Sequence, residues 1–161
     1  MNRKVTYLLI ALVLPGLLFI FLKFFGKNQF DIPVFFEKGN ANAPTECVTV
    51  AGKQYLLPDS VLTTVKWGKD VALVINGTTR EEQSELKRLI KEPKLGSLQI
   101  ISLDNIEANR LQRWKDCVFF LKAPWKAILI DSQKRIRGYY ALDSREEIDR
   151  LEVELEILLK K

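Results

Sequence analysis

The sequence predicts an α/β fold, a central mixed sheet flanked by helices, preceded by one N-terminal transmembrane helix. Residues 5–22 contain no charged side chain, and a membrane-spanning helix needs roughly 20 mostly apolar residues. From residue 71 onward, short apolar runs of strand length alternate with longer segments whose apolar residues recur at helical spacing. We therefore expect an anchor at residues 1–25, a linker at 26–45 and a folded domain at 46–161.

The apolar N-terminal run reads VTYLLIALVLPGLLFIFL and is followed by Lys23, whose long side chain can reach the headgroup region. A cleaved signal peptide is the alternative, but its apolar core is normally about 7–15 residues long and a small-residue cleavage site follows it. Bulky residues follow this run instead. Arg3 and Lys4 precede it, so the positive-inside rule places the C-terminal domain outside the cytoplasm. We expect a single-pass protein of the cell (inner) membrane with a periplasmic domain.

The segment between the anchor and the first core strand has little regular pattern. Gly, Asn, Pro and Phe are mixed in residues 26–45, which indicates a linker with one short extended piece around residues 34–36. Residues 47–58 alternate polar and apolar side chains about Ala51 and Gly52, which predicts a small hairpin.

The first core strand and helix have clear boundaries. Residues 71–75 form a continuous apolar run, typical of a strand that is buried on both faces. Thr79 can cap the next helix, Glu82 completes a capping box, and Pro93 ends the helix. Residues 98–103 predict the next buried strand.

The second half of the domain continues this alternation. Asp104 with Glu107 predicts a short helix that ends near Trp114. Residues 127–131 and 136–140 predict two strands joined by a turn.

The last helix completes a thioredoxin-like order of elements. Ser144 and Glu147 form its capping box. Strand, helix, strand and helix are then followed by a hairpin and a final helix, which is the thioredoxin order. In redox proteins of this architecture a reactive cysteine pair sits where the first strand meets its helix, but residues 76–80 contain no sulfur. One face of the last helix carries Ile148, Leu151, Leu155, Leu158 and Leu159.

Composition excludes several kinds of chemistry. The chain has no histidine and two cysteines, so Ser–His and Cys–His nucleophile pairs and a four-ligand cysteine/histidine zinc site cannot be assembled within one chain. Three basic residues around the N-terminal run account for much of the net charge of +5, and the rest of the chain carries +2 without any Lys/Arg block. We therefore expect no cofactor and no nucleic-acid partner.

The two cysteines, Cys47 and Cys117, leave two interpretations open. They lie 70 positions apart and not in a Cys-x-x-Cys pair. They are either buried or joined in a single disulfide, which an extracytoplasmic compartment permits. Alternatively they are the working pair of an oxidoreductase, which requires a pKa-lowering group beside them.

Pro124 precedes the strand at residues 127–131, as a cis-proline precedes the equivalent strand in thioredoxins. In those proteins the cis bond exposes backbone that binds an extended partner chain. An ordinary trans turn is the alternative, since most X–Pro bonds are trans. We take Pro124 and Trp125 as the expected partner-contact loop.

The C-terminal sequence AILIDSQKRIRGYYALDSREEIDRLEVELEILL resembles the end of the SCO family, the membrane-anchored copper chaperones of cytochrome oxidase assembly, called SenC-like in bacteria. Asp131 at the end of a strand, a turn, and then Arg137, Gly138, Tyr139 and Tyr140 match the tail motif of that family. The resemblance implies a thioredoxin-like domain on a membrane anchor and a place in respiratory-complex assembly.

The copper ligands that the resemblance implies have no counterpart in this chain. The first cysteine of the family's Cys-x-x-x-Cys motif would fall near Thr78, Thr79 or Arg80, the second near Ser84, and its histidine near Ala127. Copper(I) needs thiolate or thioether ligands, which hydroxyl groups cannot replace. We expect a degenerate redox site with neither a metal ligand nor a catalytic residue.

These features predict a membrane-anchored, extracytoplasmic, SCO-like protein that has lost redox and copper chemistry. Its expected partners are the membrane and a protein, which it contacts as an interaction or assembly factor of a respiratory or envelope complex. Two alternatives stay open: a thiol–disulfide oxidoreductase that uses Cys47 and Cys117, and a purely structural subunit of a membrane complex.

Overall fold

The computed structural model describes residues 12–21, 23, 31–40, 43–68, 70–90 and 98–159, and the chain divides into two compact units, Met1–Asp31 and Ile32–Lys161. In the first unit, residues 12–21 are helical. No helix within the described ranges combines the length and the apolar character that crossing a bilayer requires. Most of the expected anchor, namely residues 1–11, 22 and 24–25, lies outside the described residues.

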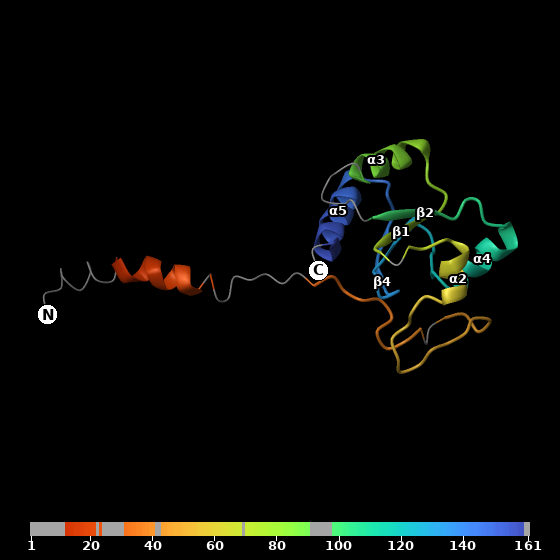
Figure 1. The fold of residues 1–161 in the computed structure, drawn as a ribbon, viewed down its shortest axis with the longest axis horizontal. Coiled ribbons are helices and arrows are strands. Elements are labelled where there is room, and N and C mark those ends of the chain that lie inside the picture. Colours follow the sequence, from red (N-terminus) through yellow and green to blue (C-terminus); the bar gives the residue numbers. More distant parts are fainter. Residues whose placement is uncertain are drawn as a thin grey trace, which may run out of the picture. The chain divides into compact units, whose positions relative to one another are not determined.

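The second unit is a mixed α/β domain built on a four-stranded sheet of order β2-β1-β3-β4 (Figure 1). β1 pairs in parallel with β2, β3 is antiparallel to β1, and β4 is antiparallel to β3. The prediction of a mixed sheet is confirmed, and each strand lies within one residue of its expected bounds. The strands are β1 (Ala72–Ile75), β2 (Gln99–Ser102), β3 (Ala127–Ile130) and β4 (Ile136–Tyr140).

Helices cover both faces of the sheet (Figure 1). Successive side chains of a strand point to opposite faces, so β1 contributes to two separate cores. Leu73 and Ile75 pack with α3 and α5, whereas Ala72 and Val74 pack on the side of α2 and α4. The helices are α2 (Asp59–Thr64), α3 (Arg80–Ile90), α4 (Ala108–Cys117) and α5 (Arg145–Leu159).

Part of the expected linker is built into the domain. Ile32 and Asn40 are buried, and Phe36 packs against the core on the side of α2 and α4. The extended piece expected around residues 34–36 is wrong, because residues 35–38 form a turn in which Phe36 has a φ of 59°.

The hairpin expected at residues 47–58 is also wrong. Gly39 forms an isolated antiparallel bridge with Ala51, and the N–H of Tyr55 donates to the carbonyl of Phe36 at 3.0 Å. Backbone polar groups need partners, and those of Val50, Gly52 and Tyr55 find them in residues 36–40 rather than in each other. The chain then enters α2 directly after Pro58, a helix that the sequence pattern did not predict.

Candidate functional site

The junction between β1 and α3 is closed by hydrogen bonds. The N–H of Thr79 donates to Oε2 of Glu82 at 2.7 Å, and the N–H of Glu82 donates to the Thr79 hydroxyl at 3.2 Å. The predicted capping box is therefore confirmed. The side-chain amide of Gln83 donates to the Thr78 hydroxyl at 3.2 Å. The hydroxyl groups of Thr78 and Thr79, two positions of the expected degenerate redox site, thus hold the start of the helix in place.

The other two residues of that expected site lie on the surface of the domain and do not form a reaction centre. Arg80 and Ser84 are both exposed residues of α3. Ala127, where the family's histidine would stand, is fully buried in β3. Arg80 and Ser84, near the two cysteine positions of the family, are therefore surface residues. Ala127, near the family's histidine position, is a small core residue.

Glu82 joins the junction to the loop before β3. The Lys126 ammonium lies 2.7 Å from Oε1 of Glu82, and the N–H of Asn76 donates to the Lys126 carbonyl at 2.9 Å. In the same loop Pro124 is exposed and its bond to Ala123 is cis. The structure thus brings the β1–α3 junction next to the expected contact loop.

The Glu82 carboxyl group is shielded, with a side chain that is 11% exposed. Burial raises its pKa, but the hydrogen bonds from Lys126 and Thr79 and the Lys126 charge outweigh burial, so the pKa lies below its ordinary value. A general acid or base that works near neutral pH needs the opposite shift. Glu82 is therefore one member of an ion pair, ionised at neutral pH.

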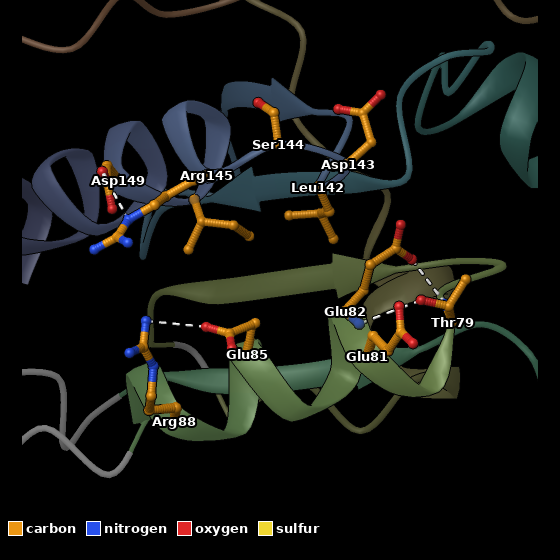
Figure 2. A pocket seen from close by; sticks show the side chains of 11 residues that line it. Thr79, Glu81, Glu82, Glu85, Arg88, Leu142, Asp143, Ser144, Arg145 and Asp149 are labelled. Atoms are coloured by element: carbon orange, nitrogen blue, oxygen red, sulfur yellow. Dashed lines mark hydrogen bonds and ion pairs between the residues drawn. The ribbon is translucent and has the colours of Figure 1, made fainter.

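A cleft of about 530 Å³ lies beside this junction, between α3 and the N-terminal part of α5 (Figure 2). Each wall carries an exposed ion pair within its own helix, Arg88 with Glu85 at 2.9 Å in α3 and Arg145 with Asp149 at 4.0 Å in α5. Carboxylates outnumber guanidinium groups, so the cleft is acidic. In the part of the chain that the structure describes, no three side chains of the metal-binding types are grouped to hold an ion. The charged lining residues are Glu81, Glu82, Glu85, Arg88, Asp143, Arg145 and Asp149.

The cleft itself was not predicted from the sequence, although Glu82 was expected to complete the capping box at the start of α3. A partial signal is present, because both helices begin with carboxylates: Glu81 and Glu82 in α3, Glu146 and Glu147 in α5. Acidic side chains are favoured at helix N-termini by the helix dipole, so this pattern is common in any helix. Only the packing of two such helices side by side makes a cleft, and that depends on the fold.

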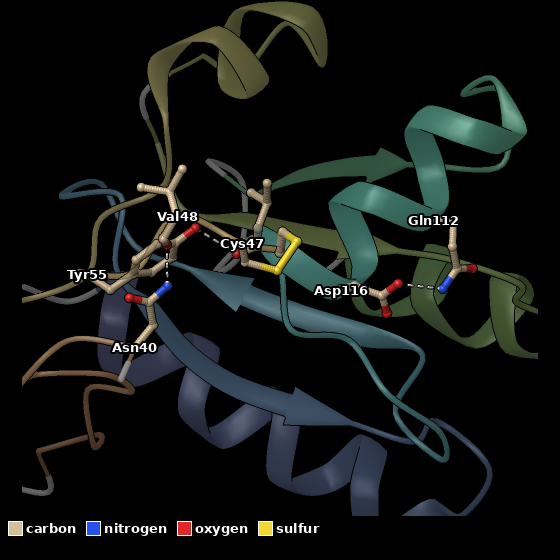
Figure 3. The surroundings of a disulfide bond; sticks show 8 residues. Asn40, Cys47, Val48, Tyr55, Gln112 and Asp116 are labelled. Atoms are coloured by element: carbon tan, nitrogen blue, oxygen red, sulfur yellow. Dashed lines mark hydrogen bonds between the residues drawn. A yellow bond between two sulfur atoms is a disulfide. The ribbon is translucent and has the colours of Figure 1, made fainter. Parts of the chain in front are cut away.

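Cys47 and Cys117 are joined in a disulfide bond (Figure 3). The bond ties the segment before α2 to the last residue of α4, and Cys47 is 7% exposed. Neither cysteine lines the cleft beside the β1–α3 junction. The structure therefore places the sulfur atoms in a cross-link and not at the site where thioredoxin-like proteins keep theirs.

Asp131 and Arg137 of the expected tail motif form a buried ion pair. The Arg137 guanidinium donates to Oδ2 of Asp131 at 3.1 Å and also to the carbonyl of Ile32. The same carboxylate accepts the N–H groups of Gln133 and Arg135, which closes the turn between β3 and β4. This pair holds the fold together and is not open to a ligand.

The rest of the motif packs around β4. A Cβ atom on Gly138 would lie 2.4 Å from the Tyr140 hydroxyl, so only glycine lets that ring cross the strand. The Tyr140 hydroxyl donates to Glu154 at 2.5 Å, and the Tyr139 hydroxyl donates to the carbonyl of Phe119 at 2.8 Å. Burial raises the pKa of both tyrosines above the ordinary value. The Gly-Tyr-Tyr sequence is thus explained by packing.

Comparison with known proteins adds no relative. No family model, no curated protein and no solved structure matches this chain. The resemblance to the SCO family stays an expectation from the sequence, carried chiefly by the tail motif.

Proposed function

We propose that this chain is a membrane-anchored, extracytoplasmic protein with a thioredoxin-like domain that works through protein contacts and has no thiol or copper chemistry. Its place is the assembly of a respiratory complex or another envelope complex. One observation carries the proposal: the β1–α3 junction is occupied by the Thr79–Glu82 capping box and the Glu82–Lys126 ion pair, without a reactive group.

The topology supports a thioredoxin-like domain. β1, α3 and β2 form a parallel βαβ unit, and the antiparallel β3–β4 hairpin and α5 complete the layers. The sheet order β2-β1-β3-β4 puts the first strand in the centre, so its carboxyl end and the start of α3 meet the loop before β3. Thioredoxin-like proteins bind their partners at this meeting point.

The donor set argues against copper. Copper(I) is bound by soft sulfur ligands. The two cysteines are consumed in the disulfide, and Met1 is the single methionine of the sequence. Copper(I) titration of the full chain in detergent, against a competing chelator, is expected to show no stoichiometric binding tighter than micromolar. A one-to-one complex below that range would contradict the proposal.

The acidic cleft beside the junction is the proposed contact surface for the protein partner. Its excess of carboxylates suits a partner that presents basic side chains, since complementary charge steers association. A photo-crosslinking residue in place of Glu81, at the cleft, is expected to capture one defined protein in native membranes. Arg110, exposed on α4 on the other side of the sheet, is the matched control position. Capture at neither position, or at both equally, would contradict this assignment.

A thiol–disulfide oxidoreductase is the second candidate, and the Cys47–Cys117 bond is the observation in its favour. Exchange requires a thiolate to reach one of the two sulfur atoms, and Cys47 is 7% exposed while Cys117 is half-buried. We expect the bond to resist mild dithiothreitol in the native protein and to be reduced after denaturation. Rapid reduction of the native protein would favour the enzyme instead.

A further inference from the structure

An aromatic groove of about 210 Å³ lies along β4, the edge strand of the sheet. Three rings from separate parts of the chain line it: Phe35, Trp125 and Tyr139. Phe35 is 37% exposed and Trp125 is 38% exposed. The Phe35 ring stands edge-on to the Tyr139 ring, with centroids 5.1 Å apart. The fold therefore holds a fixed, partly exposed aromatic surface, and the Trp125 side chain belongs to this groove and not to the acidic cleft.

The polar groups around the groove already have partners. The N–H of Phe35 donates to the Ile136 carbonyl at 2.9 Å, and Arg150 donates to the Tyr139 carbonyl at 2.5 Å. Glu154, the one acid among the lining residues, accepts the Tyr140 hydroxyl and lies 3.8 Å from Arg150. The outward carbonyl groups of Ile136 and Tyr139 in β4 thus already accept hydrogen bonds, which disfavours the addition of a partner strand at this edge. The surface that a partner could contact in the groove therefore consists of aromatic rings with a guanidinium group at their border.

The sequence limits how far this groove can be from the membrane. Pro33 lines the groove, and the expected anchor ends at residue 25. Eight peptide units, even fully extended, cover at most about 30 Å. A domain of about 130 residues is itself roughly 35 Å across. The chain length therefore keeps Pro33 within reach of the bilayer that holds the expected anchor, and it does not itself select the face of the domain that meets the lipid.

We propose that the Phe35–Trp125 groove docks on the surface of that bilayer, with both rings in the interfacial layer. Tryptophan and other aromatic side chains favour the membrane–water interface, where the ring is partly desolvated and polar tips stay wet. The occupant is a lipid surface, and the contact fixes the orientation of the domain on the membrane. This inference rests on the proposed membrane anchoring.

Photo-crosslinking of the full chain in vesicles of phosphatidylethanolamine and phosphatidylglycerol tests it. p-Benzoylphenylalanine replaces one residue at a time: Phe35 or Trp125 in the groove, Leu18 in the N-terminal run, and Val48, which is 81% exposed elsewhere on the domain, as control. We expect lipid adducts at Leu18, Phe35 and Trp125, each several-fold more abundant than at Val48, measured by mass spectrometry.

The outcomes separate the two proposals. Lipid adducts at Leu18 but none above the Val48 level at Phe35 and Trp125 overturn the docking and leave the anchor standing. No lipid adduct at Leu18 contradicts the anchor, and the docking with it. Protein adducts in place of lipid at Phe35 and Trp125 also overturn the docking.

Fluorescence quenching by brominated lipids gives a second measurement that does not need the crosslinker. Quenching is expected in the unaltered chain and in Trp67→Phe, whose indole N–H is bonded to Asp70 within the domain, but is expected to fall strongly in Trp125→Phe. Equal quenching in Trp125→Phe and the unaltered chain would overturn the docking.

Discussion

The guanidinium of Arg137 lies 3.1 Å from the carboxylate of Asp131, and each residue is 4% exposed. The pair is surrounded by further polar contacts, because Arg135 also binds the carboxylate at 2.7 Å and Arg137 reaches the Ile32 carbonyl. Additional hydrogen bonds of this kind make a buried ion pair tolerable. The charged half of the tail motif therefore has a structural role that does not depend on copper.

Asp131→Asn is expected to destabilise the domain by about 3–5 kcal/mol, because it leaves the Arg137 guanidinium buried without its counter-charge. Urea unfolding followed by circular dichroism measures the loss. The double variant Asp131→Asn with Arg137→Met is the control for coupling. Its loss is expected to be clearly smaller than the sum of the two single losses, and strict additivity would contradict the pairing.

Gly138→Ala is expected to cost about 2–3 kcal/mol, since the added methyl group would meet a fully buried ring and overpacking has that cost. The new Cβ would stand 2.4 Å from the hydroxyl and 2.8 Å from Cζ of Tyr140. Gly68→Ala is the matched control, because its Cβ would meet only the Gln99 side chain at 3.4 Å. Thermal unfolding measures the stability of both variants. Equal stabilities of Gly138→Ala and Gly68→Ala would show that Gly138 is not needed for packing.

Removal of the disulfide by Cys47→Ser with Cys117→Ser is expected to lower the free energy of unfolding by about 4 kcal/mol, the chain-entropy value for a closed loop of this size. The loop spans 70 positions. Dithiothreitol after denaturation should lower the stability of the unaltered chain to that of the double variant and leave the variant unchanged. A reduced chain as stable as the oxidised one would show that the bond has no structural role.

Glu82→Gln is expected to change the acid limb of the stability curve. The folded pKa of Glu82 lies below its ordinary value of 4.5, so the ionised carboxylate stabilises the fold above pH 4.5 and this contribution disappears as the pH falls through the folded pKa. At neutral pH the unaltered chain should be more stable than the variant by about 1 kcal/mol, and the two should converge in acid.

Glu85→Gln is the control for that measurement. Glu85 pairs with Arg88 on the surface, where both side chains are more than half exposed, so its loss should leave the acid limb unchanged. A variant at Glu82 whose deficit persists below the folded pKa would show that the carboxylate charge is not the cause.

The core of the domain followed from local sequence patterns. β1 and β3 are continuous apolar runs because both of their faces are covered, and that pattern needs no knowledge of the partner elements. The Thr79–Glu82 box is likewise a contact within one turn of helix, which three-residue spacing reveals. Strand bounds and helix starts of this kind are readable wherever the contacts are local.

The expectations that failed depend on contacts between distant residues. Asp104 was expected to begin a helix, but its carboxylate accepts the N–H of Gly77 from the β1–α3 loop at 2.9 Å, and α4 starts at Ala108. Residues 48–50 were expected to pair with the second half of a hairpin. Instead, the side chain of Asn40 binds the backbone of Val48 and Val50. Neither of these contacts produces a periodic pattern of residues in the sequence from which it could be predicted. The acidic cleft and the aromatic groove were missed for the same reason.

The bond from Arg137 to the Ile32 carbonyl joins positions 105 residues apart. During synthesis at about 5–20 residues per second, roughly 5 to 20 s pass between the emergence of these two residues from the ribosome. Through that interval the start of the domain lacks the side chain that secures it. The domain can therefore close fully only after its last hairpin has been translated.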